Sequence, residues 1–238
     1  GPTLIDIPDD IQRMMVSEAD LSQFTTPTRA PELSTLGIDA SVSLAQLVRE
    51  ASRPVFICGS GIHLAGREEA MSLFLESVGW PTLLTWGAAD LLDNNSVVRV
   101  GTFGTHGTRL GNFTVQNADL IVSIGSRLDT KATGSPVTTF APGARIVMFD
   151  VDNTELEKFS NFGKSLDLKI CLNLRDDSFM EALAIIEKNA VTPTEWLDFI
   201  RNSEVSLCEE RSEVIPGVVE PYRFIDALAE ATPASSRV

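Results

Sequence analysis

Arg127 and Asp129 stand directly after an apolar run, residues 120–124, that ends at Gly125 and Ser126. The run predicts a buried strand, and open α/β sheets bind their ligands beyond the carboxyl ends of such strands. A glycine there lets a ligand approach the backbone, and an arginine offers a planar fork of donors that matches a phosphate. The segment therefore predicts part of a nucleotide site, although an ordinary strand exit with a surface ion pair has the same composition.

Two glycine-rich segments contain groups of the same kind. Gly59, Ser60 and Gly61 follow an apolar run at 55–58 and precede a helical pattern, which would place a phosphate at a helix N-terminus. They lack the full dinucleotide motif, and a tight strand-to-helix turn explains them equally well. Residues 101–108 combine hydroxyl groups and His106 with three glycines, which suits ribose or phosphate. No nucleophile or carboxylate is spaced to make His106 a catalytic base.

Asp150 and Asp152 end a further apolar run, residues 146–149. A carboxylate at a strand end can accept the hydroxyls of a ribose, whereas an aspartate before a helix can cap its N-terminus. Both roles can hold, with one residue for each. The chain contains no Walker-type loop, no Gly-x-Ser-x-Gly turn and no His-Glu-x-x-His motif, so the sequence shows no complete active site.

The elements that must position these residues alternate between strand and helix. Apolar runs predict strands at 55–58, 81–85, 97–100, 120–124, 146–149 and 166–172, besides a short strand at 3–7. Helical spacing predicts a helix from Leu44 with Ser43 as N-cap, and others at 71–78, 110–117, 153–158, 176–188, beyond Pro193 and at 222–230. This alternation, with strands apolar on both faces, predicts an α/β fold with a doubly wound parallel sheet.

Composition narrows the class of protein. With 33 acidic and 19 basic residues the net charge is −14, which argues against nucleic-acid binding and against an anionic membrane surface. No apolar run approaches the roughly 20 residues of a membrane span. The three cysteines, Cys58, Cys171 and Cys208, form no Cys-x-x-Cys pair, so we expect no zinc site and a reducing, cytoplasmic location.

Four segments, in order and at matching spacing, make the chain similar to a known family. They are residues 1–12, 103–108 with Asn112 and 115–119, 125–134, and 149–152 with Glu155. Together they resemble the thiamine-diphosphate-dependent enzymes of the acetolactate (acetohydroxyacid) synthase group. The family's stretches at the last three read Gly-Met-His-Gly-Thr, Gly-x-Arg-Phe-Asp-Asp-Arg-Val-Thr-Gly and His-Ile-Asp-Ile-Asp.

The resemblance implies five segments. Residues 1–18 would be the tail of an N-terminal pyrimidine-binding domain, 19–42 a linker and 43–190 a Rossmann-like central domain with a six-stranded parallel sheet. Residues 191–218 would be a helical linker, and 219–238 the start of a C-terminal diphosphate-binding domain. In this family the central domain holds FAD in a structural role. The implied FAD contacts are Gly59, Ser60, Gly61, Thr85, Trp86, Gly104, Thr105, His106, Gly125, Ser126, Arg127, Asp129, Lys131, Asp150 and Val151.

Two positions depart from the family pattern. Lys131 stands where the family has an arginine, and Asn173 where it has an aspartate. Related enzymes hold ADP in this domain, or nothing, so the occupant stays open among FAD, ADP and none. The resemblance places the glutamate that activates thiamine diphosphate before Gly1, and the Mg²⁺ motif after Val238. It therefore implies no catalytic residue and no metal ligand in this chain, and an inactive isolated fragment.

The implied parent enzyme decarboxylates a 2-oxo acid or forms or cleaves C–C bonds with thiamine diphosphate and Mg²⁺, as a homodimer or homotetramer. Two alternatives stay open. One is a non-catalytic module that binds flavin or nucleotide or supports dimerisation. The other is an NAD-dependent deacylase of the sirtuin type, whose Gly-Ala-Gly-Ile-Ser loop is similar to residues 59–62, although its four-cysteine zinc module is missing here.

Overall fold

The computed structural model describes residues 4–19, 36–207 and 217–233. The chain divides into a short unit, Gly1–Glu32, and a large unit, Leu33–Val238. In the short unit, residues 4–8 form no regular structure and helix α1 (Asp9–Gln12) follows. The predicted strand at 3–7 is therefore wrong for residues 4–7, and Thr3 lies outside the described residues. A strand needs a partner for its backbone groups, and the described part of this unit contains no other strand.

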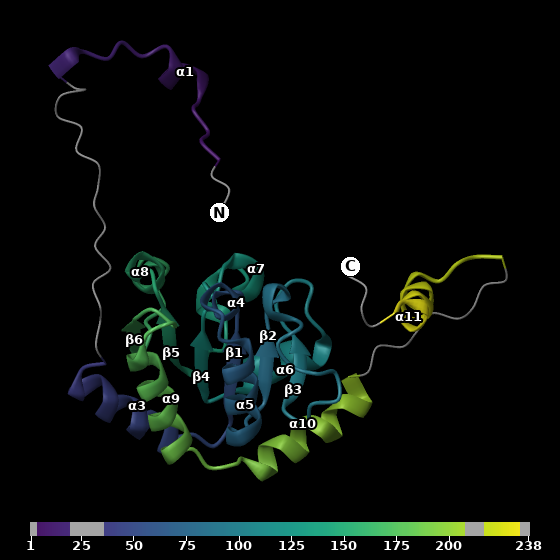
Figure 1. The fold of residues 1–238 in the computed structure, drawn as a ribbon. Coiled ribbons are helices and arrows are strands. Elements are labelled where there is room, and N and C mark those ends of the chain that lie inside the picture. Colours follow the sequence, from purple (N-terminus) through teal and green to yellow (C-terminus); the bar gives the residue numbers. More distant parts are fainter. Residues whose placement is uncertain (1–3, 20–35, 208–216, 234–238) are drawn as a thin grey trace. The chain divides into compact units, whose positions relative to one another are not determined.

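A six-stranded parallel sheet forms the centre of the large unit (Figure 1). Its strands are β1 (Pro54–Cys58), β2 (Thr82–Leu84), β3 (Arg99–Thr102), β4 (Leu120–Ile124), β5 (Arg145–Asp150) and β6 (Leu168–Cys171). They lie in the order β3-β2-β1-β4-β5-β6, and every neighbouring pair is parallel. The predicted α/β class with a doubly wound six-stranded sheet is confirmed. The chain reverses its direction of strand addition between β1 and β4, and such a switch point opens a crevice at the carboxyl edge.

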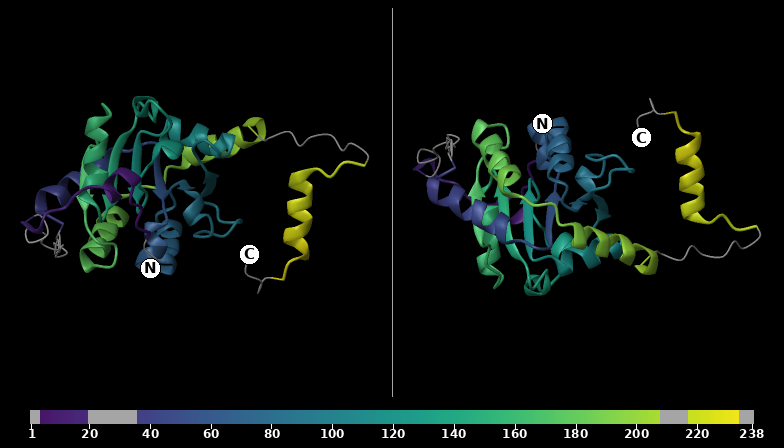
Figure 2. Two further views of the ribbon diagram at one scale, coloured as in Figure 1. Left: turned by 90° about the horizontal axis from the view of Figure 1, so that it is seen from above. Right: turned by 90° about the horizontal axis from the view of Figure 1, so that it is seen from below.

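Helices cover both faces of this sheet (Figure 2). One face packs against α3 (Ile38–Glu50), α5 (Glu68–Val78) and α9 (Asp177–Asn189). The other packs against α6 (Arg109–Asn117), α8 (Asn153–Asn161) and α10 (Thr194–Leu207). Four short elements follow strand ends or loops, namely α4 (Gly61–Ala65), the 3₁₀ turns η1 (Trp86–Ala88) and η2 (Val137–Thr139), and α7 (Thr130–Thr133). The predicted helix at 222–230 is α11 (Pro221–Ala231).

The two helix layers explain why the strands are apolar throughout. Phe56 and Cys58 of β1 enter one core cluster, whereas Val55 and Ile57 enter the other, and all four are fully buried. A strand buried on both faces has no polar side to reveal an alternation. None of the helices in the described ranges is long and apolar enough to cross a membrane.

Helix α3 begins earlier than its apolar spacing predicts. Its first residue is Ile38 and its N-cap is Gly37, so Ser43 lies inside the helix and is not the cap. The side chains of Ile38 and Val42 are exposed, and burial begins only at Leu44. Because apolar periodicity reports buried positions, it misses a solvent-exposed first turn.

Candidate functional site

A cavity of about 810 Å³ lies at the carboxyl edge of the sheet, across the exits of β1 and β4. Its size is in the range of small-molecule and cofactor sites. Strands β1 and β4 end level with each other, since Cys58 pairs with Ile124. The two loops that follow them therefore leave the sheet side by side.

The backbones of these two loops pack without room for side chains. The Gly59 N–H donates to the Ile124 carbonyl (3.0 Å), and the Gly61 N–H donates to the Gly125 carbonyl (2.9 Å). A Cβ atom on Gly59 would lie 2.4 Å from the Gly125 carbonyl oxygen, and one on Gly61 would lie 2.7 Å from the Gly125 Cα. Gly125 has a φ of +61°, which favours glycine. The glycines thus have a structural role beyond a simple turn.

The loop after β4 presents cationic groups at this edge. Asp129 caps the short helix α7, because one carboxylate oxygen accepts the N–H groups of Lys131 and Ala132 (both 3.0 Å). Neither Arg127 nor Lys131 forms an ion pair with any described residue, so the alternative of a surface ion pair between Arg127 and Asp129 is not what the structure shows. Both side chains are exposed at the cavity and are available to an anion.

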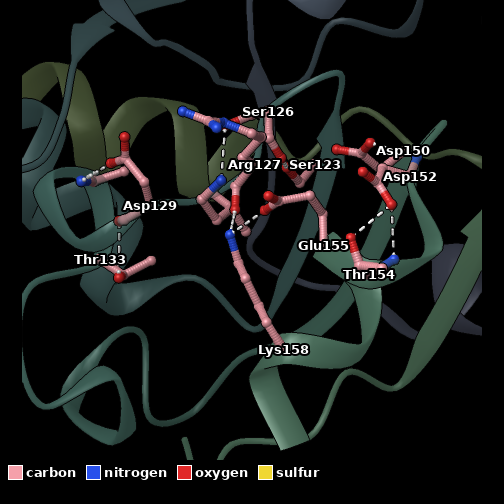
Figure 3. A network of polar contacts seen from close by, with 12 residues as sticks. Ser123, Ser126, Arg127, Asp129, Thr133, Asp150, Asp152, Thr154, Glu155 and Lys158 are labelled. Atoms are coloured by element: carbon pink, nitrogen blue, oxygen red, sulfur yellow. Dashed lines mark hydrogen bonds and ion pairs between the residues drawn. The ribbon is translucent and has the colours of Figure 1, made fainter. Parts of the chain in front are cut away.

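Lys158 of α8 holds this loop from the neighbouring element (Figure 3). Its ammonium group donates to the Arg127 carbonyl (2.5 Å) and pairs with the Glu155 carboxylate (2.5 Å). Glu155 lines the cavity. The Arg127 backbone is therefore fixed from one side by Lys158 and continues into the capped helix α7 on the other.

The aspartate that ends β5 and the one two residues later have different partners (Figure 3). Asp152 is the N-cap of α8, and its Oδ1 accepts the Thr154 N–H (2.9 Å). Asp150 accepts the Asp152 N–H (2.9 Å) through Oδ1 and is buried at the cavity wall. Burial raises the pKa of Asp150, and the nearby charges of Glu155 and Asp152 add to the increase. One aspartate thus caps a helix, and the other holds a backbone N–H at the cavity wall.

The far wall of the cavity is aromatic. Trp86 and His106 come from the exits of β2 and β3, and their ring centroids are 5.2 Å apart. Both side chains are exposed, so this pair can contact a flat ring system. Thr105 connects the wall to α7, because its N–H donates to the Lys131 carbonyl (2.8 Å).

Gly104 is the one predicted residue outside the cavity lining. Its φ is +93°, and a Cβ atom there would lie 2.4 Å from the Lys131 carbonyl oxygen. Gly104 therefore packs the loop after β3 against α7. The predicted residues that the structure does bring together around the cavity are Gly59, Ser60, Gly61, Thr85, Trp86, Thr105, His106, Gly125, Ser126, Arg127, Asp129, Lys131, Asp150 and Val151.

Sequence reasoning gave no site role to Glu155 or Arg175 and named Asn173 only as a departure from the family pattern. All three residues line the cavity. Asn173 and Arg175 follow β6, and the strand-end rule that singled out Arg127 applies to them as well. Glu155 lies in the first turn of α8, one turn beyond a strand exit. A charged residue in the first helical turn after a strand is the sequence feature that could have predicted Glu155 at the cavity.

Comparisons with known proteins identify the family of this chain. The family model "Thiamine pyrophosphate enzyme, central domain" matches residues 42–174, more than half of the chain. The acetolactate synthase large subunit of Corynebacterium glutamicum is 28% identical over 232 residues, which cover 97% of this chain and 36% of that protein. The isozyme 2 large subunit of Escherichia coli is 33% identical over 159 residues, which cover 66% of this chain and 28% of that protein. A probable acetolactate synthase of Oryza sativa subsp. japonica is 32% identical over 204 residues, which cover 84% of this chain and 29% of that protein.

The chain thus spans about a third of the length of these relatives. Its parallel sheet and its family match coincide, because residues 42–174 include all six strands. The chain therefore belongs to the thiamine pyrophosphate enzymes and contains their central domain, of the kind found in acetolactate synthases.

Proposed function

We propose that the cavity binds the ADP portion of FAD, or ADP itself, within an acetolactate-synthase-like enzyme. The observation that carries this proposal is the contact between the loops after β1 and β4. Their glycines let the two backbones pack against each other, so that both loops line the cavity at the switch point, where α/β sheets bind nucleotides.

The chemistry of the lining suits each part of such a nucleotide. The exposed cations of Arg127 and Lys131 would contact the phosphates, and the Asp150 carboxylate would accept ribose hydroxyls. The ring pair of Trp86 and His106 offers a face for the flavin of FAD. An arginine can donate two parallel hydrogen bonds to a phosphate, whereas the ammonium group of Lys131 acts as a point charge. Arg127 would therefore form the two-pronged hydrogen bond to the phosphates.

We place thiamine diphosphate and its Mg²⁺ outside the described residues. Within residues 4–19, 36–207 and 217–233, no group of three or more His, Cys, Asp or Glu side chains is arranged to hold a metal ion. When bound to the parent enzyme, thiamine diphosphate supplies the carbon that takes up the charge left by decarboxylation of a 2-oxo acid. The role of this chain is then to bind and orient the nucleotide, in a parent that we propose to be a cytoplasmic homodimer or homotetramer.

The first experiment is to denature the purified chain and identify what it releases, by absorbance and by mass. Released FAD supports the flavin form of the proposal, and released ADP supports the form without flavin. A folded chain that releases neither, and that binds neither when each is added, contradicts the nucleotide role. That result would favour the alternative of a packing or dimerisation module. Neither the family match nor the relatives support the deacylase alternative.

A further inference from the structure

His63 lies on α4, next to the cavity but outside its lining, and its two ring nitrogens face two carboxylates. Nδ1 is 3.1 Å from Glu68 Oε1, and Nε2 is 2.8 Å from Asp90 Oδ1. An ionised carboxylate only accepts hydrogen bonds, so both contacts are hydrogen bonds only when both ring nitrogens carry a proton. The geometry therefore fits the imidazolium form of His63.

These three residues join three segments around the cavity. Glu68 begins α5, and Asp90 follows the turn η1. Helix α4 contributes Gly61 and Leu64 to the cavity wall, and η1 contributes Trp86 and Gly87. The hydrogen bond between His63 and Asp90 thus spans two walls of the cavity.

The two walls also touch directly beside this bond. A Cβ atom on Gly87 would lie 2.9 Å from the Ser60 Cβ, so η1 packs closely on the loop after β1. A small displacement of η1 would therefore move both Trp86 and the glycine loop that begins at Gly59. The carboxylates of Glu68 and Asp90 are the titratable groups that face the ring from the elements packed against it.

We propose that His63 is a positioning residue for nucleotide binding, which holds α4 and η1 together only while its ring carries both protons. This inference rests on the proposed function of the cavity. Burial lowers the pKa of His63, but the hydrogen bonds to Glu68 and Asp90 outweigh it, and the net shift is upward. A raised pKa means that the connection is complete below the ordinary value of about 6.5. It is lost as the pH rises through the raised value.

The test measures ADP affinity of the full chain by calorimetry between about pH 6 and about pH 9, the range in which a histidine changes charge. We expect affinity to fall on the order of tenfold across the titration of His63. His63→Gln removes the charge and the titratable group. We therefore expect this variant to bind ADP weakly at every pH, with no fall in affinity as the pH rises. The second readout is the ring ¹⁵N spectrum of His63, which needs no nucleotide and should show both nitrogens protonated at about pH 6, below the ordinary pKa of histidine.

Matched variants separate this role from general effects on charge and folding. Asp90 has a side chain that is 82% exposed, so Asp90→Asn leaves the core intact while it weakens one of the two bonds. Because the Asp90 carboxylate raises the pKa of His63, its removal should move the pH at which ADP affinity falls to a lower value. Asp93→Asn and Glu69→Gln each remove one negative charge from the same segments without contact to the ring, and they should leave the step unchanged.

Each outcome decides between the two proposals. Affinity that is equal in the wild type and in His63→Gln at every pH overturns the positioning role alone, as does a ring with one protonated nitrogen at about pH 6. Failure of the wild type to bind ADP or FAD at any pH overturns the proposed function as well. If the wild type binds ADP tightly at pH values below the titration of His63 and His63→Gln does not, the result supports both the nucleotide role of the cavity and the positioning role of His63.

Discussion

At the scale of single residues, Asp150 is the strongest test of the cavity. Asp150→Asn keeps the size of the side chain and the acceptor for the Asp152 N–H but removes the negative charge. We expect ADP binding to weaken by about 1–3 kcal/mol, because a charged acceptor for ribose hydroxyls is lost. Asp167→Asn, a similar change at the opposite edge of the sheet where Asp167 accepts the Ile146 N–H, should leave ADP binding unchanged.

The change Asp150→Asn should weaken ADP binding but increase the stability of the fold. Because the folded state raises the pKa of Asp150, it binds this proton more tightly than the unfolded chain does. The charged form therefore destabilises the fold at neutral pH, and the free energy of unfolding increases as the pH falls through the raised pKa. Asp150→Asn should unfold at a higher temperature than the wild type at neutral pH while it binds ADP more weakly. A lower unfolding temperature would mean that Asp150 has a structural role.

Two glycines provide a second contrast at this scale. Gly59→Ala forces a Cβ atom to within 2.4 Å of backbone in the next loop, whereas Gly37→Ala meets nothing within 4 Å at an ordinary negative φ. Overpacking of this kind costs about 1–3 kcal/mol, and Gly59→Ala should also reduce nucleotide binding. Gly37→Ala changes the N-cap of α3 without a steric clash and should cost clearly less. Chemical denaturation of the two variants checks the difference, and equal stability would contradict the packing of the two loops.

At the scale of elements, the cap of α7 controls where the cations lie. Asp129→Ala removes the acceptor for the N–H groups of Lys131 and Ala132, at a cost of about 1 kcal/mol. Asp129→Asn keeps an acceptor and is the matched control. We expect faster hydrogen exchange at both amides and weaker ADP binding in Asp129→Ala alone. Equal ADP affinity in the two variants would show that the position of the cap does not matter for binding.

The elements also show what can be predicted from the sequence. Every strand of the sheet contains residues from a predicted apolar run, and the residues at strand exits, such as Arg127 and Asp150, follow from the same rule. The helix α4 was not predicted, because five residues are too few to establish a helical period. The contacts of Lys158 with the Arg127 carbonyl and of His63 with Asp90 join residues 31 and 27 positions apart, and only the folded chain brings them together.

At the scale of the whole molecule, the cavity contains exposed cationic side chains although the chain as a whole is strongly acidic. The chain carries −14, yet Arg127 and Lys131 at the cavity have no ion-pair partner among the described residues. Interactions between exposed charges more than about 10 Å apart are largely screened by salt at moderate ionic strength. We therefore expect the charges that line the cavity, cationic and anionic, to affect anion binding more than the distant acidic surface does.

The large unit should account for both folding and binding on its own. All residues that line the cavity lie between Gly59 and Arg175, and both core clusters lie between Leu44 and Ile200. We therefore expect a chain that begins at Leu33 to keep the unfolding temperature and the ADP affinity of the full chain. With ADP at about a hundred times its Kd, both chains should gain about 2.7 kcal/mol in the free energy of unfolding.

Thermal unfolding with and without ADP checks this expectation on the two chains side by side. A shorter chain that unfolds at a lower temperature but gains the same free energy from ADP would mean that residues 1–32 stabilise the fold without reaching the cavity. A smaller gain from ADP would place part of the binding site in the short unit. The cavity would then need residues that the large unit lacks.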